Sequence, residues 1–264
     1  MAAGKWVWGG GVAASCVLAA VCVLVCLVGC QGQPEQARLT VYAASSLTDV
    51  GRALEAGFEA ANPGVDVVMV FAGSQTLRLQ LEQGAAADLF ISANEDHVDA
   101  LEAGNLASSR QVLAHSALVL VVPRDNPARI QSFKDLPSAA RLVLGTEQVP
   151  VGRYAKQVIG RAGQRWGADW SERVERAVVS REANVRLVRA KVAMGEADAA
   201  VVYRTDALGQ PGLLSIPIPE SLGVRARYVQ TRLSGAKRPE LAARWSGFVR
   251  SEAGRRLWRQ HGFE

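Results

Sequence analysis

Short apolar segments typical of strands alternate with amphipathic helical segments from residue 39 onward. The first predicted strands lie at 39–44, 66–72 and 87–92, and the first predicted helices lie at 47–61 and 75–83. These helices are followed by residues that commonly end helices, Asn62-Pro63-Gly64 and Gly84. Apolar strands separated by helices favour a mostly parallel sheet with helices on both faces. The chain is therefore predicted to have an α/β fold.

The pattern restarts after residues 117–123, an apolar run. The later predicted strands lie at 141–144, 177–179, 199–203, 213–218 and 227–231, and the later helices at 152–161, 185–195, 239–250 and 251–260. A second series of this kind within 264 residues predicts two lobes. In open α/β sheets ligands bind beyond the carboxyl ends of the strands, so the cleft between the lobes is the expected site.

Two of the predicted strand-to-helix junctions carry small hydroxylated residues. Residues 42–48 read Tyr-Ala-Ala-Ser-Ser-Leu-Thr, and residues 71–77 read Phe-Ala-Gly-Ser-Gln-Thr-Leu. A helix start offers unpaired backbone N–H groups and the positive end of the helix dipole, which together suit an anion. Ser46 and Ser74 are therefore candidate ligands of one oxyanion. The alternative for each serine alone is ordinary helix capping.

Two later turns offer backbone donors of the same kind. In Val149-Pro150-Val151-Gly152, the proline rigidifies the turn and leaves the Val151 N–H free to point outward. Asn184 is a good N-cap, and the Val185 N–H is then among the unpaired donors of the first turn. Both turns could also be routine helix starts. Tyr203 ends an apolar strand whose carboxyl end belongs to the same predicted cleft.

Little in the sequence indicates catalysis. His97, His115 and His261 belong to no recognisable triad or metal-ligand spacing, and no phosphate-binding glycine loop or nucleophile elbow occurs. Asp88 and Asp206 are interpreted as caps or lobe-joining polar residues rather than as a carboxylate pair. The net charge of +5 comes from dispersed basic residues, which favours a solvated surface over nucleic-acid binding. We expect neither an enzyme nor a resident cofactor.

The N-terminal segment predicts export. All four cysteines lie in the first 30 residues, so no disulfide framework is expected in the rest of the chain. Residues 9–29 are uncharged and follow Lys5, as in a secretory signal. Leu27-Val28-Gly29-Cys30 looks like a bacterial lipobox, which predicts a signal peptide at 1–29, a lipid-modified Cys30 and a linker at 30–37. The alternative is an uncleaved anchor helix, because the apolar segment is long enough to span a bilayer.

Over roughly 39–263 the chain resembles the molybdate-binding proteins of bacterial molybdate ABC transporters. The segments that carry the resemblance keep their order and spacing across the whole domain. They are the two junction motifs at 41–48 and 71–77, Ala-Asp-Leu-Phe-Ile-Ser-Ala at 87–93, Val-Pro-Val-Gly-Arg-Tyr-Ala at 149–155, Asn-Val-Arg at 184–186, Gly-Glu-Ala-Asp-Ala-Ala-Val-Val-Tyr-Arg-Thr-Asp-Ala at 195–207 and His-Gly-Phe at 261–263.

This resemblance implies a two-lobed periplasmic-binding-protein fold of type II, with lobe I at 38–113 and 226–264 and lobe II at 114–225. It implies that molybdate or tungstate is held by neutral donors alone. These are the hydroxyls of Ser46, Ser74 and Tyr203 and the backbone N–H groups of Val151 and Val185. It further implies a monomeric, exported protein that passes the oxyanion to an ABC permease and its ATPase subunit.

The chain departs from the family pattern near the first-lobe serines. Ser45 stands where alanine is common, Gly73 and Gln75 replace serines, and Val151 replaces a small alanine. Rival functions are a receptor for sulfate or another tetrahedral anion, an enzyme on the same scaffold, and a ligand-gated signalling domain.

Overall fold

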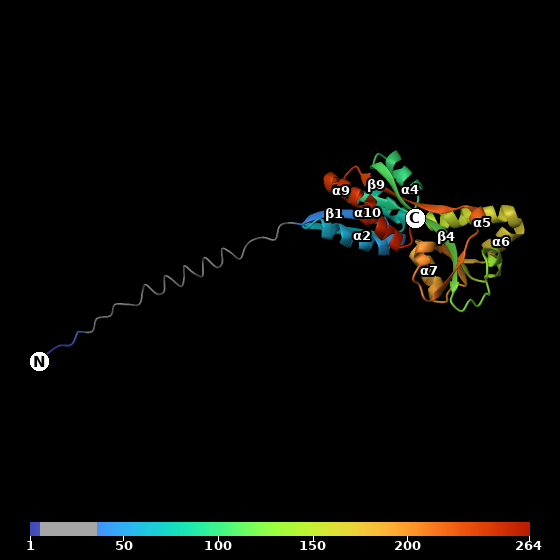
Figure 1. The fold of residues 1–264 in the computed structure, drawn as a ribbon, viewed down its shortest axis with the longest axis horizontal. Helices are drawn as coiled ribbons and strands as arrows, with labels where there is room; N and C mark the ends of the chain where they lie inside the picture. The colour runs from blue at the N-terminus through green and yellow to red at the C-terminus, as the bar shows by residue number, and fades with distance from the viewer. Residues whose placement is uncertain (6–35) are drawn as a thin grey trace. The chain divides into compact units, whose positions relative to one another are not determined.

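The structure, a computed structural model, describes residues 1–5 and 36–264, and Arg38–Glu264 form the folded unit (Figure 1). Cys30, most of the predicted signal peptide (1–29) and most of the predicted linker (30–37) lie outside the described residues. Among the residues that are described, no helix is long and apolar enough to cross a membrane.

The folded unit is built on a nine-stranded sheet in the order β2-β1-β3-β9-β4-β7-β5-β6, with β8 paired to β4. The strands are β1 (Ala37–Ala44), β2 (Val65–Ala72), β3 (Leu89–Ser92), β4 (Ala107–Pro123), β5 (Leu142–Gly145), β6 (Val178–Glu182), β7 (Ala199–Tyr203), β8 (Leu213–Pro217) and β9 (Arg225–Leu233). The pairs β1–β3, β5–β6 and β5–β7 are parallel, whereas β4 and β9 pair antiparallel with their neighbours. The α/β class is confirmed, and the sheet is mixed.

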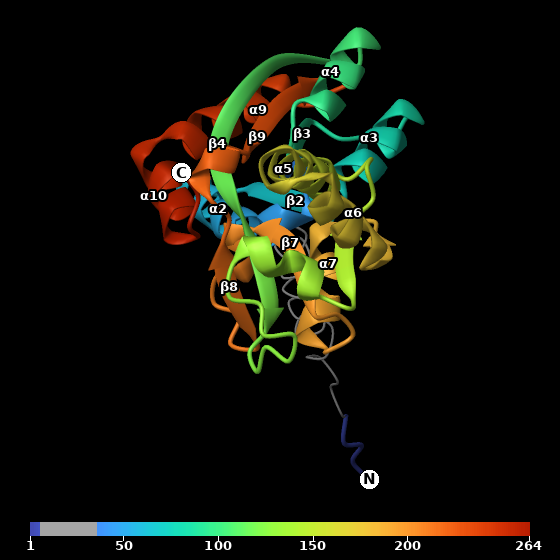
Figure 2. The ribbon, with the colours of Figure 1, turned by 90° about the vertical axis from the view of Figure 1, so that its right-hand side faces the viewer.

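Strand β4 lies in the middle of this sheet and connects its two parts (Figure 2). Its first part, from Ala107 to Ala117, pairs with β9, and its second part, from Leu118 onward, pairs with β7 and β8. We call β1, β2, β3, β9 and the first part of β4, with their helices, the first half. The second half consists of β5 to β8, the second part of β4 and their helices.

Helices cover each half of the sheet. They are α2 (Thr48–Ala61), α3 (Ser74–Glu82), α4 (Asp96–Ala103), α5 (Pro150–Trp166), α6 (Ala168–Arg176), α7 (Val185–Ala193), α8 (Arg204–Ala207), α9 (Pro239–Arg250) and α10 (Glu252–Gln260), with short 3-10 turns η1 (Ser45–Leu47), η2 (Phe133–Ser138) and η3 (Glu220–Leu222). In the first half α2, α9 and α10 pack together, and α3 packs against α4. In the second half α5 packs on α6, and both α5 and α7 contact β5 and β7.

Aromatic side chains anchor the helices in each half. Phe58 of α2 meets Trp245 of α9 edge-on, with ring centroids 5.3 Å apart, and both are buried. In the second half Trp170 of α6 packs on Phe133 at 5.7 Å and on Trp166 at 5.0 Å. Such edge-to-face pairs add about 0.5–1.5 kcal/mol each beyond the area they bury. These contacts fix α2, which follows the junction that contains Ser46, and α6, which packs on α5.

Most predicted elements are confirmed, with a few differences. The boundaries of β7 and α9 agree with those predicted. The sequence pattern missed α4, α6 and α8, and the apolar run at 117–123 is the end of the longer strand β4, which begins at Ala107. Residues 107–116 alternate polar and apolar residues irregularly and form no continuous apolar run, so their strand structure comes from pairing with β9.

Asp88 has a structural role, but it does not join the lobes, because its partners lie in the same half. Its carboxylate accepts hydrogen bonds from the backbone N–H groups of Thr40 (2.9 Å), Lys237 (2.9 Å) and Arg238 (3.3 Å). It is 5% exposed. The side chain therefore ties β1 to the segment that leads into α9.

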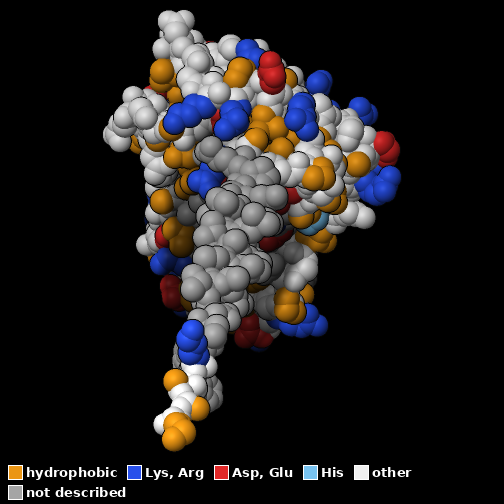
Figure 3. All heavy atoms as spheres, turned by 90° about the vertical axis from the view of Figure 1, so that its left-hand side faces the viewer, with side chains coloured by type: hydrophobic (Ala, Val, Ile, Leu, Met, Phe, Trp, Pro, Cys, Tyr) orange, Lys and Arg blue, Asp and Glu red, His pale blue; other side chains and the backbone are white. Residues whose placement is uncertain are grey.

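Basic side chains are spread over the surface. On the face shown in Figure 3, Lys and Arg side chains lie among apolar and acidic ones. Several are paired with carboxylates, as in Arg52–Glu55 (2.8 Å), Arg225–Glu264 (2.7 Å) and Arg259–Glu252 (2.6 Å). This distribution agrees with a solvated surface, in which such exposed pairs contribute little to stability.

Candidate functional site

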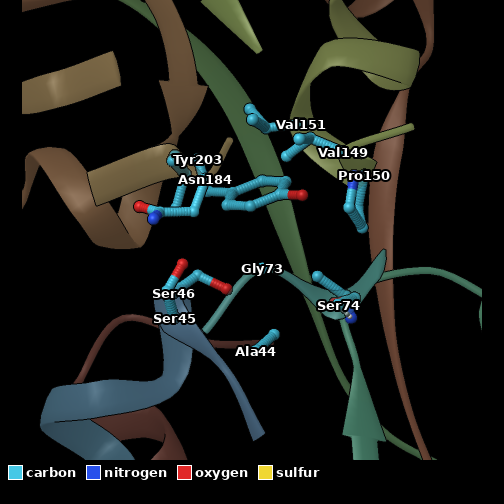
Figure 4. A pocket seen from close by; sticks show the side chains of 12 residues that line it. Ala44, Ser45, Ser46, Gly73, Ser74, Val149, Pro150, Val151, Asn184 and Tyr203 are labelled. Atoms are coloured by element: carbon cyan, nitrogen blue, oxygen red, sulfur yellow. Dashed lines mark hydrogen bonds between the residues drawn. The ribbon is translucent and has the colours of Figure 1, made fainter. Parts of the chain in front are cut away.

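A pocket of about 190 Å³, counting its opening to solvent, lies between the two halves (Figure 4). All five residues predicted to hold the ligand line it: Ser46, Ser74, Val151, Val185 and Tyr203. The remaining lining residues are Ala44, Ser45, Gly73, Ala93, Val149, Pro150 and Asn184. The structure thus brings together the starts of η1, α3, α5 and α7 with the carboxyl end of β7.

The two serines of the first half are not helix caps. Neither the η1–α2 start nor the α3 start has a side-chain cap hydrogen bond. The Ser46 hydroxyl is buried without a hydrogen-bond partner. The Ser74 oxygen accepts a bond from the Ala93 N–H at 3.2 Å, which leaves its own hydrogen free to be donated. Both hydroxyls are therefore available to a ligand in the pocket.

The second half contributes two helix starts whose sequence signals are confirmed. Asn184 caps α7, since its Oδ1 accepts a hydrogen bond from the Leu187 N–H at 3.0 Å. Pro150 occupies the first turn of α5, where it costs no hydrogen bond. Val151 and Val185 lie in the first turns, where backbone N–H groups have no partner within the helix.

Gly152 explains why α5 can start so close to the sheet. A Cβ at this position would overlap the backbone oxygens of Thr146 and Gly145 at the end of β5. Without a side chain, the helix start packs directly on that turn and brings the neighbouring Val151 to the pocket wall. The glycine thus has a packing role that the sequence pattern alone did not reveal.

Tyr203 closes the pocket on the side of the second half (Figure 4). Its side chain is 1% exposed, and its hydroxyl has no hydrogen-bond partner. Edge-on contacts with Tyr154 (6.3 Å) and Tyr228 (5.8 Å) hold the ring. Burial raises the pKa of Tyr203 well above its usual value, so the phenol stays a neutral donor.

Tyr228 is a neighbour of the site that the sequence analysis missed. It lies on β9 of the first half, is fully buried, and its hydroxyl also has no hydrogen-bond partner. Burial raises the pKa of this phenol and the charge of Asp206 adds to the rise, while the nearby hydroxyls of Ser46 and Thr205 oppose it. Nothing local marks this position as functional, because only the pairing of β9 brings it behind Ser46 and Tyr203.

The twelve residues that line the pocket are all uncharged. A carboxylate nevertheless lies nearby, since Asp206 of α8 is 3% exposed and neither of its oxygens has a hydrogen-bond partner. Burial raises its pKa to about 7, the positive charges of Arg189 and Arg186 oppose the shift, and the charge of Asp49 adds to it. Below pH 7 the protonated form of Asp206 predominates, and this carboxyl then places no negative charge near the pocket.

The arrangement suits anion binding rather than catalysis. Among residues 1–5 and 36–264, no group of three His, Cys, Asp or Glu side chains could hold a metal ion. No histidine lines the pocket, and His97 contacts the Gln148 carbonyl through Nε2 at 3.0 Å. Burial lowers the pKa of His97, which keeps the ring neutral. What the pocket offers is an uncharged lining that includes hydroxyl groups and the first turns of helices.

Comparison with known proteins gives a consistent result. Residues 39–264 match the family described as bacterial extracellular solute-binding protein. The chain is 35% identical over 228 residues to the molybdate-binding protein ModA of Mycobacterium tuberculosis, covering 85% of this chain and 84% of that protein.

Two solved structures share the fold. The periplasmic molybdate-binding protein of Azotobacter vinelandii matches with a TM-score of 0.73 and 20% identity, over 86% of this chain and 98% of that one. The sulfate-binding protein SubI of M. tuberculosis matches with a TM-score of 0.75 and 18% identity, over 86% of each chain. At these identities the structural likeness establishes the fold alone, and the expected type of fold is confirmed.

Asp206→Asn should stabilise the protein in a pH-dependent way. The native state binds the Asp206 proton more tightly than the unfolded chain, so this contribution is full below the unfolded pKa of 3.8 and is lost as pH rises through about 7. Between pH 5 and pH 8 the unfolding free energy of the variant should gain about 2–3 kcal/mol relative to the parent. Urea denaturation of both proteins at the two pH values measures this. An equal difference at both pH values would show that Asp206 is ionised throughout.

Proposed function

The chain belongs to the bacterial extracellular solute-binding proteins, and on that basis we propose that it captures molybdate outside the cytoplasm and delivers it to an ABC transporter. The family consists of binding proteins, which agrees with the expectation that the chain is not an enzyme. Tungstate, an oxyanion of the same shape and charge, is the second expected ligand.

The observation that carries this proposal is that all five predicted ligand residues line one pocket whose lining residues are uncharged. We assign the hydroxyls of Ser46, Ser74 and Tyr203 and the backbone N–H groups of Val151 and Val185 as ligands of the oxyanion. Helix starts stabilise an anion through their unpaired N–H groups and the positive end of the dipole. Hydrogen bonds to an ionised acceptor are about twice as strong as neutral ones, so several can hold a divalent anion without a countercharge.

Sulfate is the rival ligand, because a tetrahedral anion of the same charge would satisfy the same donors. The fold shared with a sulfate-binding protein does not separate the two. The similarity to a molybdate-binding relative over most of both chains favours molybdate.

The assembly that we infer has two lobes, a lipid anchor and a transporter. We assign 38–113 and 226–264 to lobe I and 114–225 to lobe II. The change of pairing partner within β4, from β9 to β7 after Ala117, supports this division.

The mature protein is then a monomer anchored through Cys30 that meets an ABC permease and its ATPase subunit. Sedimentation of the soluble domain tests the monomer, and ATP-driven molybdate uptake into vesicles tests the transporter.

Isothermal calorimetry with molybdate, tungstate, sulfate and phosphate tests the ligand class. Molybdate and tungstate should bind, and at 100 times Kd molybdate should raise the unfolding free energy by about 2.7 kcal/mol, because it binds the native pocket alone. Thermal denaturation with and without each anion checks the same point. Stabilisation by sulfate without stabilisation by molybdate would assign the protein to sulfate instead.

Deleting single donors should weaken binding without unfolding the protein. Tyr203→Phe keeps the buried ring and removes one hydroxyl, so the Kd for molybdate should rise about 10- to 100-fold. Ser46→Ala and Ser74→Ala should behave alike, with little effect on stability for Ser46, whose hydroxyl has no partner in the described structure. Calorimetry and thermal denaturation of each variant measure the two quantities. A well-folded Tyr203→Phe protein with unchanged affinity would remove Tyr203 from the site.

Lipid attachment at Cys30 should be abolished by Cys30→Ser. The lipobox-like residues 27–30 motivate this assignment, and the other cysteines lie within the predicted signal peptide. Cells fed a radioactive fatty acid should label the parent protein and leave the variant unlabelled. Label that persists in the variant would place the anchor elsewhere.

A further inference from the structure

The backbones of the two halves nearly touch beside the pocket, at Gly73 and Ala183. A Cβ on Gly73 would lie 2.5 Å from the Ala183 carbonyl oxygen, which belongs to the opposite half. The Gln75 side chain crosses at the same place, and its Nε2 donates to that carbonyl at 2.7 Å. Ala183 directly precedes Asn184 and Val185, which line the pocket. The first half therefore contacts the start of α7 through backbone as well as side chain.

A second contact runs in the opposite direction. Arg186 of α7 donates from Nε to the Ser45 carbonyl at 2.9 Å and from its terminal nitrogen to the Asp49 carboxylate at 2.6 Å. Ser45 directly precedes Ser46, one of the proposed ligands. In each half, a backbone carbonyl close in sequence to a proposed ligand residue thus accepts a hydrogen bond from a side chain of the other half.

A separate pair of contacts lies on the α4–α5 side of the pocket. Arg153 of α5 pairs with Asp96 of α4, and His97 of α4 contacts the Gln148 carbonyl. These contacts show that the described conformation has its two halves in contact on both sides of the pocket.

We propose that Gly73, Gln75 and Arg186 form a clasp that closes the pocket and positions the donors of both halves around the anion. The identity of the anion rests on the proposed function, whereas the closing action does not. Only a closed pocket presents all five donors at once, so the apparent Kd equals the intrinsic Kd divided by the closed fraction. Gln75 and Arg186 are positioning residues in this scheme, since neither is among the residues that line the pocket.

Gly73→Ala is a sharp test of the clasp. Gly73 has φ −60° and ψ 137°, which alanine adopts without strain, so the variant should fold normally. In the closed form, however, the new methyl group meets the Ala183 oxygen and the Gln75 amide. The double variant Gly73→Ala/Gln75→Ala removes the flexible side chain and leaves the overlap with the opposite backbone. If the closed fraction of the variant falls to about 1–10% of the closed fraction of the parent, the Kd for molybdate should rise about 10- to 100-fold.

Arg186→Met tests the second contact by keeping the stem and deleting the donors, and we expect about a tenfold rise in Kd. Two matched controls are available. Gly160→Ala adds a methyl group at a helical glycine of α5 that has open space around it. Arg38→Met deletes an exposed ion pair with Asp66 within the first half. Both controls should bind molybdate as the parent protein does and keep its melting temperature.

A distance measurement without ligand separates the clasp from the identity of the anion. The domain from residue 31 onward contains no cysteine and includes the whole folded unit, so introduced cysteines are the only sites at which spin labels attach. Spin labels at Gln80→Cys on α3 and Gln157→Cys on α5 sit on exposed positions of the two halves. The parent should populate a short distance, and Gly73→Ala and Arg186→Met should move that population toward a longer distance, with unchanged melting temperature.

The outcomes are distinguishable. Parent protein that shows the short distance but binds sulfate and not molybdate would overturn the proposed ligand and leave the clasp standing. Variants with parental distances and parental affinity would overturn the clasp and leave the ligand standing. Variants that lose affinity with unchanged distances would also overturn the clasp, because they would act on the ligand directly.

Discussion

A divalent anion held without a positive side chain requires many short donors within hydrogen-bond reach at the same time. In the site that we propose, hydroxyls and helix starts meet this requirement, and the helix-start donors belong to the backbone and cannot reach out as lysine or arginine can. Because backbone donors cannot move independently of the chain, the backbone itself must come close to the anion. Gly152 and Gly73 provide it, one by letting α5 start against β5 and the other by letting the two halves meet. The neutral chemistry of the site and the close packing around it are thus one constraint.

The grouping of the five predicted ligand residues around one pocket could be predicted because each of them has a local signal. Asn184 before a helical segment predicts a cap, and Pro150 predicts a first turn, and both are confirmed. Small hydroxylated residues after an apolar strand mark Ser46 and Ser74, and strand alternation predicts that their junctions share an edge. What the local signals left open was whether the serines cap their helices. The structure answers that neither does, because the donors of each first turn have no bond to a serine side chain.

The features that escaped prediction depend on partners distant in sequence. The first part of β4 is a strand through pairing with β9, about 120 residues later in the chain. Tyr228 reaches the back of the pocket through the same pairing, and the raised pKa of Asp206 comes from burial among residues of several elements. A segment of mixed polarity, a mid-strand tyrosine and an aspartate carry no pattern that reports such surroundings. Periodicity predicts which residues are buried, but not what faces them.

Strand β4 has a mechanical consequence. Because one continuous strand carries hydrogen bonds to β9 at one end and to β7 and β8 at the other, the two halves are connected by a paired ribbon rather than by a slack tether. Any rotation of one half against the other must twist this ribbon, and the register shifts between Ser108 and Gln111 and between Val112 and Ala114 are where its ladder is already interrupted. Relative rotation of the two halves therefore has to deform hydrogen-bonded strand pairs rather than a loose loop, and β4 couples their movements.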